Sequence, residues 1–285
     1  MSRESPEPIG LLACAGRFPI TIAEKARSLG IPVVCVGVEG MADPTLRALC
    51  TEYHPLRRAA LGKIIRTFQR GGVRRWSMAG KFHKHLALRP WRLVQFLPDW
   101  RMLRFWFFRK RRANNDDSVM LGLIREFRDA GLECVSPLDL CPELLVREGL
   151  LTRRKPTPAE QQDILIGWEA AKEMGRLDIG QSVMVRERVV IAVEAIEGTD
   201  KCIERAGELC ARGEFVVVKV AKPAQDMRFD VPTVGRATIE TMKKAGAKVL
   251  AIEAGRTILL DEVETIALAD RYGITVTALP DRAAA

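Results

Sequence analysis

Charged and polar residues gather at the ends of two apolar runs in the C-terminal half of the chain. The first run, residues 189–195, leads into the sequence Glu-Gly-Thr-Asp, and the second, residues 215–221, leads into a loop rich in charged and amide side chains. Ligands commonly bind at strand ends in open α/β sheets, because loops there carry polar groups on a rigid base. The polar residues concerned are Glu197, Thr199, Asp200, Lys222, Gln225, Asp226, Arg228 and Asp230.

Lys219 stands out because it interrupts the second apolar run. Four residues, Phe-Val-Val-Val, precede it and Val-Ala follows it, so the lysine is expected to be buried with its strand. Burying an unpaired ammonium group costs on the order of several kcal/mol. Lys219 therefore needs a partner or a ligand, and an anion is the natural choice.

The distribution of histidine narrows the chemistry. The chain has three histidines, His54, His83 and His85, and none follows residue 85. A Ser-His-Asp triad or a His-rich two-metal site cannot be built from the second half alone. The phosphate-binding loop G-x-x-x-x-G-K-[ST] is absent as well. What remains is a set of oxygen ligands and cations, which suits Mg²⁺ and phosphate.

Structural roles compete with this interpretation. Asp200 or Thr199 could cap a helix, and Glu194 could point to solvent from its strand. Asp226 and Asp230 lie between two prolines, where aspartates often stabilise turns. Four polar residues within six positions nevertheless favour a ligand site at residues 225–230.

The chain as a whole reads as two α/β domains. A chain of 285 residues is long for one hydrophobic core. Residues 9–38 have the pattern of a βαβ unit, and short strands alternate with helices from residue 158 onward. The prolines and glycine in residues 137–158 make this the best linker candidate. We expect an N-terminal domain at 1–146, a linker and helix start at 147–162 and a C-terminal α/β domain at 163–285.

Further elements follow from the apolar pattern. We expect a helix at 56–69, a strand at 73–79, a helix at 119–130 and a hairpin of strands 181–186 and 189–195 around Glu187-Arg188. The cysteines indicate a reducing compartment. The chain has seven cysteines and no Cys-x-x-Cys pair, so neither a zinc site nor a disulfide framework is indicated, and reduced thiols are typical of cytosolic proteins. No signal-peptide pattern or run of about 20 apolar residues is present, so we expect a chain that is neither secreted nor transmembrane.

Positive charge is concentrated in one region. The net charge is +9, but residues 57–112 contain 17 Lys or Arg against a single acidic residue, Asp99, so the rest of the chain is acidic. Within it, residues 86–112 interleave Trp and Phe with Arg and Lys. Core-facing helices and a segment at a membrane interface explain this pattern about equally well. Binding to single-stranded nucleic acid explains it less well, because no nucleic-acid motif accompanies it.

Four segments carry a resemblance to a known family. They read LLACAGRFP, RLDIGQSVMVRERVVIAVEAIEGTD, FVVVKVAKPAQDMRFDVPTVG and AKVLAIEAGRTILLD. These segments resemble the UDP-2,3-diacylglucosamine pyrophosphatases of the LpxI type, and the likeness extends through nearly the whole chain. It implies a Rossmann-like N-terminal domain, a C-terminal mixed α/β domain and Mg²⁺-dependent attack of water on the α-phosphorus. The products would be UMP and 2,3-diacylglucosamine 1-phosphate, an intermediate of lipid A synthesis.

The resemblance also implies roles for individual residues. Asp226 matches the family's essential aspartate, for Mg²⁺ binding or water activation, and Asp230 joins it as a catalytic candidate. Glu197 and Asp200 would complete the metal site with Asp226. Contacts to the substrate would come from Gly16, Gln181, Thr199, Lys219, Lys222, Gln225 and Arg228. The turn before Gly16, usually rich in glycine in the family, is Cys14-Ala15 here.

The implied substrate is a nucleotide that carries two acyl chains. Residues 86–112, with Trp and Phe beside Arg, would suit contact with a membrane or with the acyl chains. We expect peripheral attachment to the anionic cytoplasmic face of the inner membrane, no nucleic-acid partner, and leave a homodimer open. Two rival functions remain, a non-catalytic nucleotide-lipid carrier and a nucleic-acid-binding protein that uses residues 57–112.

Overall fold

The chain folds into two compact units. A computed structural model describes residues 6–57, 60–81, 99–102, 104, 116–223 and 225–281. Unit 1 consists of Met1–Pro142 together with Met227–Phe229, and unit 2 consists of Glu143–Asp226 together with Asp230–Ala285. The division thus falls at residue 142, and residues 147–162, expected as a linker and helix start, contain a short strand and the first turns of a long helix.

Unit 1 is built on a five-stranded sheet in which all neighbouring strands are parallel. The strand order is β3-β2-β1-β4-β5, which matches the first five strands of dinucleotide-binding sheets. The strands are β1 (Ile9–Ala13), β2 (Val33–Val38), β3 (Glu52–Leu56), β4 (Arg75–Ala79) and β5 (Glu133–Cys134).

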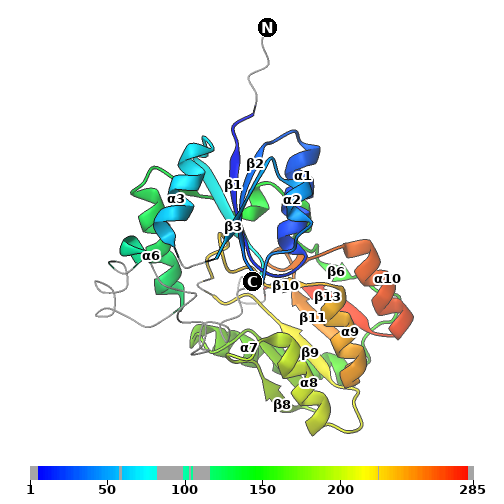
Figure 1. Cartoon of the computed structure of the whole chain (residues 1–285). Coiled ribbons are helices and arrows are strands. Elements are labelled where there is room, and N and C mark those ends of the chain that lie inside the picture. Colours follow the sequence, from blue (N-terminus) through cyan, green and yellow to red (C-terminus); the bar gives the residue numbers. More distant parts are fainter. Residues whose placement is uncertain are drawn as a thin grey trace. The chain divides into compact units, whose positions relative to one another are not determined.

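Helices cover both faces of this sheet. Figure 1 shows α1 (Phe18–Ser28) and α2 (Leu46–Leu49) on one face and α3 (Leu61–Arg70) and α6 (Asp116–Arg128) on the other. Two 3₁₀ helices, η2 (Pro137–Asp139) and η3 (Pro142–Leu144), follow β5. Helices on both faces of a parallel sheet are the arrangement that α/β proteins require, so the expected α/β class is confirmed.

The core beneath α3 and α6 explains why these helices form. Leu61, Ile64, Ile65 and Phe68 recur at helical spacing in α3 and are all buried. Trp76 of β4 stacks on Phe127 of α6 with ring centroids 4.0 Å apart, and both residues are buried. Aromatic burial on this scale dominates the energetics of a small core.

One strand of unit 1 was not expected from the sequence. Residues 52–56 form β3 at the edge of the sheet, whereas we expected a helix to begin at residue 56. The helix begins five residues later, at Leu61. The sequence Glu-Tyr-His-Pro-Leu contains Pro55 and lacks an apolar run. An edge strand tolerates proline, and here its pairing with β2 decides the conformation.

Unit 2 contains a six-stranded mixed sheet in the order β6-β13-β11-β9-β7-β8. The central strands β13, β11 and β9 are parallel, while β6, β7 and β8 pair antiparallel. The expected mixed α/β class of this half is confirmed. The strands are β6 (Gly149–Leu150), β7 (Ser182–Arg186), β8 (Val189–Val193), β9 (Val216–Lys219), β11 (Val249–Glu253) and β13 (Thr275–Leu279), beside a separate parallel pair of β10 (Thr233–Val234) and β12 (Ile258–Leu259).

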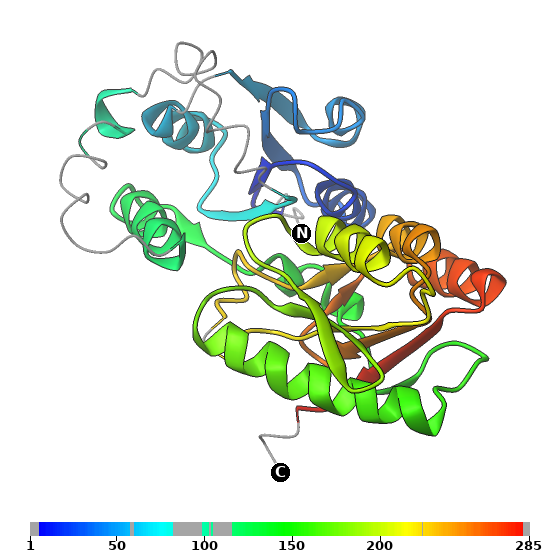
Figure 2. The same ribbon diagram turned by 90° about the horizontal axis from the view of Figure 1, so that it is seen from below.

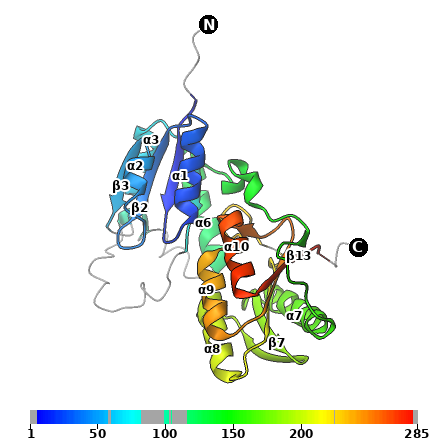
Figure 3. The ribbon, with the colours of Figure 1, turned by 90° about the vertical axis from the view of Figure 1, so that its right-hand side faces the viewer.

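This second sheet also lies between helices. The long helix α7 (Pro158–Arg176) covers one face, and α8 (Thr199–Leu209), α9 (Arg236–Ala245) and α10 (Glu262–Tyr272) cover the other. Figure 2 shows the sheet between the green α7 and the yellow to red α8–α10, and Figure 3 gives the same arrangement from the side. In β9, Val216 and Val218 pack toward α7 and Val217 toward α8–α10, so the strand is apolar on both faces.

The hairpin of β7 and β8 turns at Glu187-Arg188, as expected. Both turn residues have a positive φ, 49° and 65°, which is the conformation that a tight two-residue hairpin requires. Neither residue is glycine or asparagine, so the turn needs outside support. Asp163 of α7 provides it, because its carboxylate accepts hydrogen bonds from the backbone N–H groups of Glu187 (3.0 Å) and Arg188 (2.6 Å).

The basic aromatic segment at 86–112 lies outside the described residues except for 99–102 and 104. Within that exception, Asp99 accepts hydrogen bonds from the backbone N–H groups of Gly62 (2.7 Å) and Met102 (2.9 Å), and Arg101 pairs with Glu126. In the parts of the chain that the structure describes, no helix is both long and apolar enough to cross a membrane. The membrane role of the segment stays a prediction.

We predict that Asp163→Ala lowers the free energy of unfolding by about 3 kcal/mol, because two hydrogen bonds to a buried charged group are lost. Asp163→Asn keeps one acceptor oxygen and should cost less than half as much. Urea unfolding followed by circular dichroism measures both values. Equal losses for the two variants would contradict the proposed role of the carboxylate in the turn.

Candidate functional site

Four polar side chains of unit 2 meet at one edge of its sheet. Lys219 is the last residue of β9 and is paired with Ser182, the first residue of the antiparallel neighbour β7. Glu194 directly follows β8, and its backbone N–H donates to the carbonyl of Ser182 at 2.9 Å. Thr199 is the first residue of α8. Three strands and one helix therefore deliver these groups to the same place.

The Thr199 hydroxyl lies at the centre of this cluster. Lys219 Nζ donates to Thr199 Oγ1 (3.1 Å), and Thr199 Oγ1 donates to Glu194 Oε1 (3.0 Å). Ser182 Oγ lies 3.3 Å from the same hydroxyl, and Lys219 Nζ also donates to the carbonyl of Thr233 at 3.1 Å. The hydroxyl thus connects an ammonium group with a carboxylate, which is how the sheet accommodates a lysine that is only 5% exposed.

Glu194 is buried, contrary to the expectation that it could face solvent. Its exposed fraction is 7%, and its Oε2 atom has no hydrogen-bond partner among the described residues. The chain approaches very closely here, because a Cβ atom at Gly180 would overlap the carbonyl oxygen of Glu194. Only glycine fits at position 180, so the Gly-Gln pair at 180–181 has a steric origin.

The first three backbone N–H groups of the loop after β9 are all hydrogen-bonded. The N–H groups of three consecutive residues, Val220, Ala221 and Lys222, donate to three different acceptors. These are the Gln181 carbonyl (3.0 Å), the Glu253 carboxylate (2.7 Å) and the Gln225 side chain (2.7 Å). Gln225 also reaches Gln181 Oε1 at 3.4 Å. The two glutamines expected as substrate contacts therefore bond the start of this loop.

Lys222 is paired with carboxylates. Its Nζ atom lies 2.6 Å from Asp178 Oδ1 and 3.9 Å from Asp230 Oδ2. The backbone of Asp230 donates to the carbonyl of Asp226 at 3.0 Å, which closes the turn at 226–230. Lys222, Asp226 and Asp230, all predicted site residues, are thus close in sequence and all belong to unit 2.

Arg228 belongs to the other unit. The tripeptide Met227–Phe229 is part of unit 1, where Phe229 packs against the core beneath α3 and the hydroxyl of Ser136 donates to the Met227 carbonyl at 2.9 Å. The predicted site residues Asp226 and Asp230 flank this tripeptide in sequence. The sequence alone gave no sign that three residues of the loop belong to the first core.

The carboxylates predicted to bind metal have different surroundings. Glu197 accepts a hydrogen bond from the Ala195 N–H at 3.1 Å and pairs with Arg205 at 2.8 Å, so both its oxygens are engaged. Asp200 lies in the first turn of α8, and the helix is capped by Gly198, which overturns a capping role for Asp200 or Thr199. Within the described ranges, no three His, Cys, Asp or Glu side chains converge as a protein-only metal cage would require.

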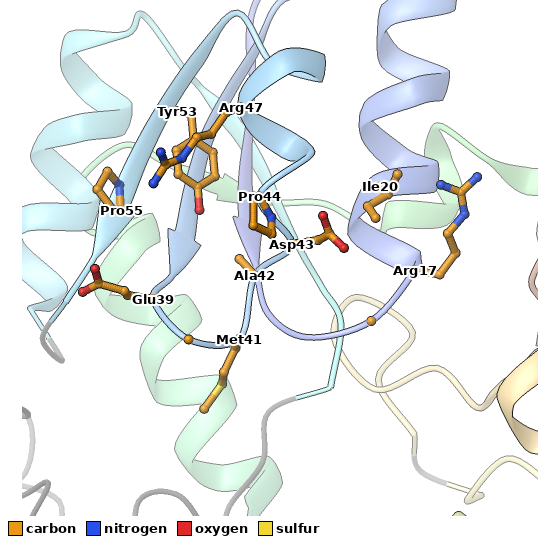
Figure 4. Close-up of a pocket in the computed structure, with 12 residues that line it drawn as sticks. Arg17, Ile20, Glu39, Met41, Ala42, Asp43, Pro44, Arg47, Tyr53 and Pro55 are labelled. Atoms are coloured by element: carbon orange, nitrogen blue, oxygen red, sulfur yellow. The ribbon is translucent and has the colours of Figure 1, made fainter. Parts of the chain in front are cut away.

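Unit 1 contains a cavity of about 700 Å³ at the carboxyl ends of β1, β2 and β3. Gly16 lines it, and Figure 4 shows residues of the β1–α1 and β2–α2 connections around it. Sequence analysis missed Glu39, directly after β2, and Arg47, whose guanidinium lies 5.4 Å from the centre of the Tyr53 ring. The position of Glu39 at the end of the second strand was a usable signal, since acidic residues there often contact sugars.

Cys14 lies at the entrance to the turn before Gly16. Its backbone N–H donates to the carbonyl of Ala79 at 2.9 Å, and burial raises the pKa of its thiol to about 11. The thiol is therefore neutral at pH 7. Where the family turn is rich in glycine, this chain therefore has a neutral, partly buried thiol.

We predict that Thr199→Val lowers the free energy of unfolding by on the order of 3 kcal/mol, because Lys219 loses an acceptor and Glu194 loses its donor. Thr199→Ser keeps the hydroxyl and should retain most of the stability. Urea unfolding of both variants at the same pH tests this. Equal stability of the valine variant and the wild type would rule out the hydroxyl as the centre of the cluster.

Both halves of the chain match models of known protein domains. The LpxI N-terminal domain model matches residues 8–144, and the LpxI C-terminal domain model matches residues 147–277. A curated relative, the UDP-2,3-diacylglucosamine pyrophosphatase LpxI of Caulobacter vibrioides, is 31% identical over 279 residues, which cover 94% of this chain and 96% of the relative. The resemblance seen in the sequence segments is confirmed, and the chain belongs to the LpxI family.

Proposed function

We propose that this protein is a hydrolase that cleaves the diphosphate of UDP-2,3-diacylglucosamine, releasing UMP and 2,3-diacylglucosamine 1-phosphate for lipid A synthesis. The observation that carries the proposal is the 31% identity to a pyrophosphatase of that name, which extends over almost the full length of both chains. Full-length similarity matters because it includes the sheet edge and the loop described above, rather than the fold alone.

The polar edge of unit 2 suits a diphosphate. Lys219 supplies positive charge next to the amino terminus of α8, where backbone N–H groups favour anions, and Lys222 supplies a second positive charge on the loop after β9. Lys222 is engaged with Asp178 and Asp230, so a phosphate group would replace carboxylates at that ammonium group. Arg228, Gln181, Gln225, Thr199 and Gly16 complete the proposed substrate contacts.

In the proposed reaction, the oxygen of a water molecule bonds to the α-phosphorus. The bond from that phosphorus to the bridging oxygen breaks, and the bridging oxygen leaves with the β-phosphate. The water oxygen stays on UMP, and its protons pass to a base. Asp226 either accepts a proton from the water or ligates the metal, and Asp230, which shares its turn, assists.

Magnesium is the proposed cofactor, and the carboxylates among the predicted site residues are ligands of the kind that Mg²⁺ takes. Mg²⁺ in phosphoryl-transfer sites is commonly held by one or two carboxylates together with substrate phosphates and water. Asp226, Asp200 and Glu197 are the carboxylate candidates, and Glu197 also pairs with Arg205 and accepts a hydrogen bond from the Ala195 N–H. When bound, Mg²⁺ would neutralise charge on the phosphoryl oxygens.

The basic region at 57–112 suits a substrate that is embedded in a membrane. We propose that it brings the protein to the anionic inner face of the inner membrane, where a diacylated nucleotide would reside. Positive charge near an anionic leaflet contributes about 1 kcal/mol per Lys or Arg. Exposed members of this set on α3 are Lys63, Arg66 and Arg70.

We predict that Asp226→Asn lowers the rate of UMP release about 100- to 10,000-fold, because a positioned base or metal ligand is lost. EDTA should abolish UMP release by the wild type. Glu240→Gln, an isosteric change at an exposed position of α9, serves as the control and should behave like the wild type. Unchanged turnover of the Asp226 variant would remove this residue from catalysis, and binding of the substrate without UMP release would favour the carrier function.

We also predict that the protein floats with vesicles of phosphatidylglycerol and phosphatidylethanolamine at 0.1 M salt, and much less at 1 M, since the Debye length falls from about 10 Å to about 3 Å. The triple change of Lys63, Arg66 and Arg70 to glutamate should weaken binding. Changing Lys201, Lys243 and Lys244 to glutamate alters the net charge equally in unit 2 and should have a smaller effect. No flotation at low salt would reject the membrane role, and strong binding of single-stranded RNA in its place would revive the nucleic-acid alternative.

A further inference from the structure

A buried carboxylate on the α7 side of the second sheet takes part in the loop that carries Asp226. Glu253 is the last residue of β11 and has no exposed surface. Its Oε2 atom accepts a hydrogen bond from the backbone N–H of Ala221 at 2.7 Å, and its Oε1 atom accepts one from Lys172 Nζ at 2.9 Å. Both carboxylate oxygens therefore accept a hydrogen bond, one from the main chain after β9 and one from a lysine of α7.

The charge of Glu253 is balanced locally. Lys172 lies on α7 and also donates to Asp281 Oδ2 at 3.0 Å, while Arg256 approaches Glu253 to 4.0 Å. The four groups together are neutral. A buried carboxylate without such compensation is strongly unfavourable, so the arrangement depends on Lys172 in particular.

The position of Glu253 in the sheet explains what it does. The last registered pair of β11 and β9 is Ile252 with Lys219, and beyond it the two chains part. The N–H of Ala221 no longer has a backbone acceptor on β11, and the Glu253 carboxylate takes that place. It thus continues the strand pairing by one hydrogen bond at the point where the chain turns toward Lys222.

The backbone just after Ala221 also lies directly against α7. A Cβ atom at Gly175 of α7 would lie 3.2 Å from Lys222 Cα and 3.3 Å from Pro223 Cδ, so the helix and the loop are in close contact. The backbone at 221–223 is therefore confined by α7 and fixed by Glu253. A shift here is transmitted along the chain to Gln225 and Asp226.

We propose that Glu253 is a positioning residue, which fixes the start of the loop that carries Lys222 and Asp226 and is itself held by Lys172. The inference rests on the proposed function for its catalytic readout. Geometric misplacement of reacting groups by about 1 Å can cost 100-fold in rate, which sets the scale of the expected effect.

The test compares Glu253→Gln with Glu160→Gln. Both changes are isosteric and remove a carboxylate that is ion-paired in unit 2, but Glu160 pairs with Arg154 at the opposite end of α7. The amide that replaces Glu253 has one acceptor oxygen for two donors, so either Ala221 loses its acceptor or Lys172 keeps only Asp281 as a carboxylate partner. We expect kcat for UMP release to fall about 10- to 100-fold for Glu253→Gln, with a smaller change in KM, and to stay near wild type for Glu160→Gln.

Rescue separates positioning from a general loss of stability. Adding Lys172→Met removes the competing donor, so the amide oxygen can serve Ala221 and kcat should recover in the double variant. A merely structural role predicts a further loss instead. Hydrogen exchange gives an independent readout, because the amides at 221–222 should exchange faster in Glu253→Gln while those in β9 and β11 remain protected.

The outcomes are distinguishable. A Glu253→Gln variant with wild-type kcat and unchanged exchange at 221–222 overturns the inference, even if its melting temperature falls as for Glu160→Gln. A wild-type protein that releases no UMP overturns the proposed function, and exchange at 221–222 then still decides the positioning role of Glu253.

Discussion

The ammonium group of Lys219 is the constraint on which the polar edge of the second unit depends. A lysine at the end of a strand that is apolar on both faces has to find oxygen partners or leave the sheet. Thr199 and the carbonyl of Thr233 supply such partners, and Glu194 supplies a negative charge one hydroxyl away. The start of α8, the end of β8 and the strand β10 are thereby tied to β9 through a single side chain.

Each face of the second sheet carries one buried charged residue at the ends of β9 and β11. Side chains alternate along a strand, so Lys219 points with Val217 toward α8, while Glu253 lies with Ala251 toward α7. The first group holds a positive charge at the start of α8, and the second bonds the main chain that leads into the loop. The edge at which β9 and β11 end is therefore polar on both sides, although each side has its own charge balance.

Much of this architecture could be predicted from the sequence. The apolar run at 215–221 predicted β9, and the hairpin expected at 181–195 predicted β7 and β8, each to within two residues at either end. The burial of Lys219 and its need for a partner followed from its place in an apolar run, whereas Thr199 was considered only as a helix cap or a substrate contact. The edge strand β3 escaped prediction because its five residues have no strand-like pattern and depend on pairing with β2.

Contacts between residues far apart in the chain could not be predicted from the sequence. Glu253 lies 32 residues from Ala221, and nothing in the run Val-Leu-Ala-Ile-Glu indicates that its last side chain bonds a distant backbone. The burial of Glu194 was not predicted from the sequence. In the edge strand that precedes it, the apolar side chains of Val189 and Val193 are exposed, whereas the carboxylate of Glu194 is buried. The assignment of Met227–Phe229 to unit 1 likewise depends on tertiary packing.

The ion pairs of Lys222 have a thermodynamic consequence for ligand binding. A phosphate that reaches this ammonium group exchanges one set of charge-assisted contacts for another, because Asp178 and Asp230 already occupy it. The affinity then reflects a difference between two ion pairs, not the full strength of one. Under the proposed function, the same exchange would separate Asp230 from Lys222, so that binding of the anion and release of a neighbouring carboxylate would be a single coupled event.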